Sequence, residues 1–144
     1  MMSDQNENFF ADSIEAIEAA YEFMLAYAAQ GREFEDGSGG PSIRDFLGNL
    51  DKGLDEIAYA AAEKIEAMEP QMAVRKAFDE FKYVLINDAE KAQKAVRVVL
   101  SLPSISSQMI DNLNASVHLR CLLTDIFLLD EAMKTYERTL KTGF

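Results

Sequence analysis

The sequence has no tryptophan, one cysteine, one histidine and three prolines. A single cysteine, Cys121, cannot form an internal disulfide, so the fold does not rely on an oxidising compartment. A di-iron or di-manganese site in a helical bundle normally needs two Glu-x-x-His pairs, and the residue three before His118 is Ala115. A zinc site is also not expected, because it needs several histidine or cysteine ligands and the chain has only one of each. We therefore expect no metal site and no cofactor.

Long apolar runs are also missing. No window approaches 18 consecutive apolar residues, the length that a membrane-spanning helix requires. The first ten residues, MMSDQNENFF, are acidic and lack the apolar centre of a signal peptide. We expect a cytoplasmic protein that has no membrane contact.

Basic residues are scarce in the first half of the chain. Residues 1–71 hold 16 acidic and 4 basic residues, a net charge of −12, whereas residues 72–144 hold 9 and 10, a net charge of +1. A surface this acidic repels nucleic acid and anionic lipid, so we expect no nucleic-acid partner. The acidic half either keeps the protein in solution or attracts a basic partner segment.

What the chain does contain is typical of an all-α protein. It has 144 residues, of which 49% are hydrophobic, enough for a single domain over residues 1–144. The predicted fold is an antiparallel bundle of four long helices. Within this domain we expect a disordered N-terminus at residues 1–8 and a flexible glycine-rich linker at residues 32–41.

Apolar residues spaced by three and four predict the positions of the helices, which are 9–31, 42–69, 71–101 and 105–141. Ser42 and Asp45 have the spacing of a capping box at the start of the second helix. A similar pair, Asn87 and Glu90, would make five helices if the third broke near Asn87–Asp88. The last helix is the other candidate for a kink, at Asn112, Asn114 and Ser116. Asp12 and Glu15 would likewise allow the first helix to start later.

The most informative feature is a pair of apolar seams on the last predicted helix. The first contains Ile110, Leu113, Val117, Cys121, Thr124 and Leu128, and the second contains Leu119, Leu122, Ile126, Leu129, Met133, Tyr136 and Leu140. At about 100° per residue they lie on roughly opposite sides of the helix. A bundle buries one side of each helix, so the other side predicts a protein interface. The sequence leaves open which seam faces the core.

Two residues, His118 and Cys121, are candidates for a catalytic role. A lone histidine on a long helix of a small acidic bundle resembles a histidine phosphotransfer domain, with His118 as phosphoryl acceptor. That family has a glycine at the fourth position after the histidine, where this chain has Leu122. We expect His118 to be half-buried and hydrogen bonded to a neighbour. We also expect Cys121 to be a core residue rather than a nucleophile.

We therefore predict a protein that is not an enzyme and acts by binding protein, as a homodimer. The predicted interface residues are Leu123, Phe127, Val117 and Leu128. One alternative is phosphotransfer through His118. Another is a chaperone for an export or flagellar substrate, because such chaperones are similar to this chain in size, acidity and helical content.

Overall fold

The computed structural model describes residues 2–35 and 40–142, with side chains from Phe9 onward. Helices are the only regular structure in these two ranges, which confirms the predicted all-α fold. There are five of them: α1 (Met2–Ala28), α2 (Ile43–Met68), α3 (Met72–Leu100), α4 (Ser107–Ala115) and α5 (Val117–Lys141).

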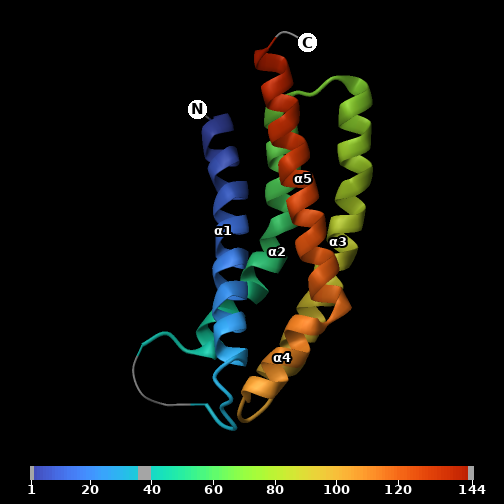
Figure 1. Cartoon of the computed structure of the whole chain (residues 1–144). Helices are drawn as coiled ribbons and strands as arrows, with labels where there is room; N and C mark the ends of the chain where they lie inside the picture. Colours follow the sequence, from blue (N-terminus) through green and yellow to red (C-terminus); the bar gives the residue numbers. More distant parts are fainter. Residues whose placement is uncertain (1, 36–39, 143–144) are drawn as a thin grey trace.

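The long helices α1, α2, α3 and α5 run up and down in sequence order, and the short α4 lies at the lower end of the molecule (Figure 1). Helix α1 packs against α2 and α4, while α3 packs against α2 and α5. The chain thus forms one elongated bundle, with α4 joining the lower end of α3 to the base of α5.

The core is built from the apolar stripes that the sequence predicts on each helix. Its largest fully buried side chains are Phe10, Ile17, Met24, Leu47, Leu50, Ile57, Ile65, Leu85, Ile105, Ile110, Leu119 and Leu122. Helices α1 and α2 approach closely at Gly53, where a Cβ would lie 2.9 Å from Cγ1 of Ile17. Packing of these stripes, rather than helix propensity alone, holds the bundle together.

The start of α2 confirms the predicted capping box. The Ser42 hydroxyl accepts a hydrogen bond from the Asp45 backbone N–H at 3.1 Å, and the Ser42 N–H donates to Asp45 Oδ2 at 3.0 Å. Two of the N–H groups that a helix start leaves unpaired are satisfied in this way. At the other end of α2, Glu69 adopts a left-handed conformation with φ of 47° and ends the helix before Pro70.

The alternative break near Asn87–Asp88 does not occur, because α3 is continuous from Met72 to Leu100. Helix α1 likewise continues through Asp12 instead of starting there. The fifth helix arises at the other candidate position, where Ser116 is extended, with φ of −58° and ψ of 130°, and separates α4 from α5. A capping pattern is only local, and the buried face of α3 carries on past Asn87 through Ala89 and Ala92.

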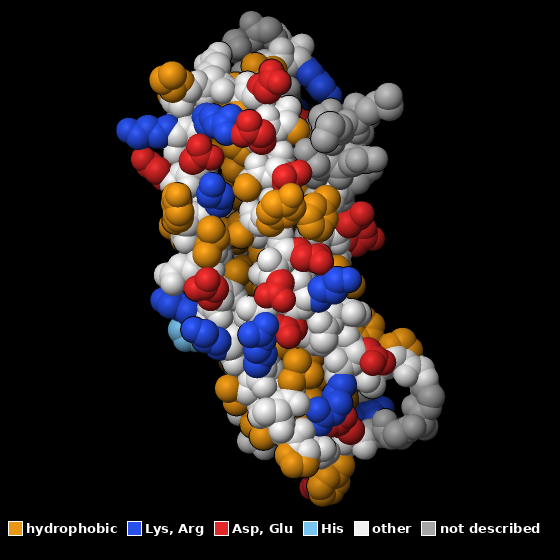
Figure 2. All heavy atoms as spheres, turned by 180° about the vertical axis from the view of Figure 1, so that it is seen from behind, with side chains coloured by type: hydrophobic (Ala, Val, Ile, Leu, Met, Phe, Trp, Pro, Cys, Tyr) orange, Lys and Arg blue, Asp and Glu red, His pale blue; other side chains and the backbone are white. Residues whose placement is uncertain are grey.

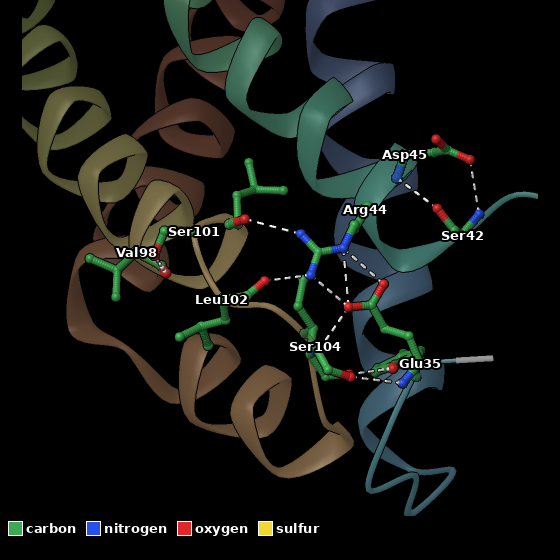
Figure 3. Close-up of polar contacts among 11 residues, drawn as sticks. Glu35, Ser42, Arg44, Asp45, Val98, Ser101, Leu102 and Ser104 are labelled. Atoms are coloured by element: carbon green, nitrogen blue, oxygen red, sulfur yellow. Dashed lines mark hydrogen bonds and ion pairs between the residues drawn. The ribbon is translucent and has the colours of Figure 1, made fainter. Parts of the chain in front are cut away.

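A polar cluster fixes the lower end of the bundle (Figure 3). The Arg44 guanidinium forms an ion pair with Glu35 at 2.8 Å and donates to the carbonyls of Leu100 and Leu102 at 3.0 and 2.5 Å. Glu35 also accepts a hydrogen bond from the Ile105 N–H at 2.8 Å. This cluster joins the start of α2 to the α3–α4 connection and holds Glu35 in place.

Glu35, which takes part in this cluster, belongs to the linker that we predicted to be flexible, and the flexibility of the linker stays a prediction. Residues 36–39 of the same linker lie outside the described residues. Disorder at residues 1–8 also stays a prediction. Residues 2–8 belong to α1, but their side chains are not among those described.

Candidate interaction surface on α5

The inner face of α5 is the second of the two predicted seams. Its central side chains are almost completely buried: Leu119 is 1% exposed, Leu122 0%, Ile126 1%, Leu129 2% and Met133 0%. These residues recur at steps of three and four and so form one continuous stripe along the helix. The structure therefore shows that the second seam packs against the core of the chain.

The outer face of α5 carries the remainder of the first seam, and we define it by Val117, Arg120, Cys121, Thr124, Phe127, Leu128 and Glu131. Val117 is 60% exposed, Leu128 59% and Phe127 50%, and Cys121 and Thr124 are exposed as well. Three large apolar side chains on one helix face are thus open to solvent. This arrangement places three of the four predicted interface residues on the surface.

Leu123, the fourth predicted interface residue, requires a correction. Its exposed fraction is 8%, and it belongs to the hydrophobic core. At about 100° per residue it lies roughly 120° from Val117, on the flank of the inner face. Leu123 therefore has little surface to offer a partner, and we omit it from the outer face.

Cys121 is likewise not the core residue that we expected. Its side chain is exposed, because the seam that contains it faces outward along α5. His118, three residues earlier, is also exposed, and its side chain forms no hydrogen bond with any described residue, so the expected half-buried histidine is wrong. Leu122 points into the core with no exposed surface and does not cover His118.

The charges on α5 are balanced, with four acidic and four basic residues between Val117 and Lys141. Lys134 pairs with Asp130 at 2.8 Å and Arg138 with Glu131 at 3.1 Å. The Arg120 guanidinium is exposed and has no ion pair with the described residues. An unpaired positive charge therefore lies at one end of the outer face and a carboxylate at the other.

A carboxyl pair lies beside this surface, between α3 and α5. The pKa of Asp125 is raised to about 7 by three causes, of which burial is the largest and a side-chain hydrogen bond with Asp88 and the charge of Asp88 are the others. Asp125 is 9% exposed, and its Oδ2 is buried without a hydrogen-bond partner among the described residues.

Sequence reasoning missed this pair. The available signal was that Asp125 flanks the buried Leu122 and Leu129 on α5, three and four residues away. A carboxylate at that spacing from two core residues lies at the edge of the buried face. The partner Asp88 could not be found in this way, because the pairing depends on how α3 packs against α5.

Large apolar side chains are exposed on other helices as well. On α3, Met72 is 87% exposed and Tyr83 68%. Figure 2 shows the molecule from behind, where hydrophobic side chains are interspersed with charges of both signs. Among the described side chains, those of residues 9–35 and 40–142, His, Cys, Asp and Glu form no group of three or more that could hold a metal ion. Over the same ranges, no helix has the length and hydropathy needed to cross a membrane.

Comparison with known proteins adds no relative. No protein-family model, curated protein or solved structure matches this chain.

Proposed function

We propose that the protein is a non-enzymatic interaction module that works as a homodimer and uses the outer face of α5. The observation that supports this proposal is the exposure of Val117, Phe127 and Leu128 on the side of α5 opposite the buried stripe that runs from Leu119 to Met133. Covering an exposed leucine or phenylalanine is worth about 1.5–3 kcal/mol in free energy. In a homodimer, each copy would cover these three side chains of the other copy.

The charge distribution supports the same face. Residues 1–71 carry a net charge of −12, so surfaces formed by α1 and α2 repel their own copies. Helix α5 has equal numbers of acidic and basic residues and lacks this repulsion. Compared with α1 and α2, α5 therefore offers a surface on which self-association meets less electrostatic repulsion.

The direct test is the mass of the purified protein in solution, measured by light scattering. We expect about twice the chain mass of 16.1 kDa at micromolar concentration. Leu128→Asp should shift the protein to monomer, because a carboxylate would be buried without a partner in the interface. Met72→Asp is the matched control, since Met72 is 87% exposed on α3 and lies outside the proposed surface. A monomeric wild type would contradict the proposal.

The exposure of His118 favours one second candidate, histidine phosphotransfer. In that function an aspartyl phosphate on a receiver protein would transfer its phosphoryl group to the imidazole of His118. Incubation with a phosphorylated receiver should then label the wild type with an acid-labile phosphate and leave His118→Gln unlabelled. If the wild type stays unlabelled, this candidate is discarded.

A further inference from the structure

We propose that two copies of the chain associate antiparallel through the outer faces of α5, with Arg120 of each copy opposite Glu131 of the other. This inference rests on the proposed homodimer and specifies its geometry. The two helices would cross near the midpoint between Asp125 and Ile126. Arg120 lies as far before this midpoint as Glu131 lies after it, so a two-fold axis there exchanges their positions.

The positions of the two charges on α5 support this register. Arg120 and Glu131 are 11 residues apart, close to three helical turns, and therefore point in directions that differ by only about 20°. Between them on the same face lie Thr124, Phe127 and Leu128. Apolar contacts would occupy the centre of the contact, and each end would hold one positive and one negative side chain.

The charge pattern favours antiparallel over parallel association. In a parallel pair of helices, Arg120 would face Arg120 and Glu131 would face Glu131, and like charges brought together at an interface oppose association. In the antiparallel pair each Arg120, which has no ion pair within the described chain, gains a carboxylate. Glu131 already pairs with Arg138 at 3.1 Å, but both side chains are more than 60% exposed and free to move toward a second copy.

A charge-reversal cycle tests the pairing. Arg120→Glu and Glu131→Arg should each weaken dimerisation by at least about tenfold, because each replaces two opposite-charge contacts by like-charge contacts. The double variant R120E/E131R should bring the dissociation constant back toward the wild-type value. Light scattering and sedimentation measure the constant, while circular dichroism confirms that these exposed substitutions leave the fold intact.

Cross-linking at cysteine provides an independent test of direction. In the antiparallel pair the two Cys121 residues would be roughly 14 Å apart along the helices at 1.5 Å per residue, too far for a disulfide. Oxidation with diamide should therefore leave wild-type dimers uncross-linked. Glu131→Cys should instead form a disulfide with Cys121 of the second copy, which peptide mapping by mass spectrometry identifies.

The outcomes separate the geometry from the dimer itself. A wild-type dimer whose Cys121 residues cross-link to each other would overturn the antiparallel arrangement. A dimer in which both single reversals have no effect, or in which the double variant stays as weak as the single ones, would overturn the Arg120–Glu131 pairing. Either result leaves the homodimer standing, whereas a monomeric wild type removes the proposed function and this geometry together.

Discussion

The two apolar seams of the last predicted helix have the same spacing but different surroundings. The second seam is buried from Leu119 to Met133, whereas Leu140 at its end is 47% exposed. The other is divided at Ser116, so that Ile110 and Leu113 are buried in α4 while Val117 and Leu128 are exposed on α5. Periodicity therefore identifies an apolar face, whereas the path of the backbone decides whether that face packs against the core.

The bend at Ser116 explains the division. An unbroken helix would keep Ile110, Leu113 and Val117 on one side. The extended backbone at Ser116 reorients α4, which packs against α1 and α3 at the lower end of the bundle. There the Asn114 side chain donates to the Met24 carbonyl at 3.4 Å. One end of the seam thus gains a core, and the rest faces solvent.

Substitutions on the inner and outer faces of α5 should differ most in their effect on stability. Leu122→Ala should lower the free energy of unfolding by about 2–5 kcal/mol, because it leaves a cavity at a fully buried position. Leu128→Ala should change the stability of the monomer by no more than about 0.5 kcal/mol. Urea unfolding at a concentration where both variants are monomeric measures the difference. Equal losses would mean that the two faces are not distinct.

A second prediction concerns pH and the flank of the buried seam. The pKa of Asp125 is raised from 3.8 to about 7, so the folded protein binds a proton that the unfolded chain releases between these values. The free energy of unfolding should therefore fall as pH rises from about 4 through about 7. Asp125→Asn removes the ionisation and should be more stable than wild type at pH 8 by up to about 4 kcal/mol.

The gain from Asp125→Asn should shrink as pH falls toward 5, where the wild-type carboxyl is protonated in the fold. Thermal unfolding at several pH values measures this dependence. Asp111→Asn, at an exposed aspartate of α4, is the control and should give no gain that grows with pH. A gain from Asp125→Asn that is the same at pH 5 and pH 8 would rule out the raised pKa.

A third prediction extends the comparison of inner and outer faces to α2. Gly48 is exposed, and no atom lies within 4 Å of its added Cβ, so Gly48→Ala should stabilise the helix by up to about 1 kcal/mol. At Gly53 the same change brings a Cβ to 2.9 Å from Ile17 Cγ1. Gly53→Ala should therefore lower stability by about 1 kcal/mol or more. Chemical denaturation of the two variants should give opposite signs.

The smallest expected change in stability concerns the like charges on the outer face of α1. Glu15, Glu18 and Glu22 are exposed at helical spacing on α1, and like charges so placed destabilise a helix by a few tenths of a kcal/mol per pair. Replacing Glu15 and Glu22 by Gln should raise the melting temperature slightly. Glu18 is kept because its charge helps raise the pKa of Lys134 on α5. An unchanged or lower melting temperature would show that the ridge is not repulsive.

Much of the fold could be predicted because it depends on local signals. Helix starts and ends follow capping residues and prolines, as at Ser42 and Pro70, and the buried stripes follow from spacing. The position of the extra break could not be chosen between Asn87 and Ser116, since both regions carry polar residues that favour turns. At the candidate site, the sequence identified exposed residues of the outer face, but it also assigned the buried Leu123 to the interface.

The sequence by itself determined that this chain is helical, that its first half is strongly acidic and that α5 has more apolar surface than one core can bury. The tertiary structure decided which seam faces inward, that Cys121 and His118 are exposed, and that Asp88 meets Asp125. The physical reason is that spacing and capping act over a few residues, whereas burial depends on contacts between helices far apart along the chain. Where a short-range signal was ambiguous, as at Ser116, packing selected the outcome.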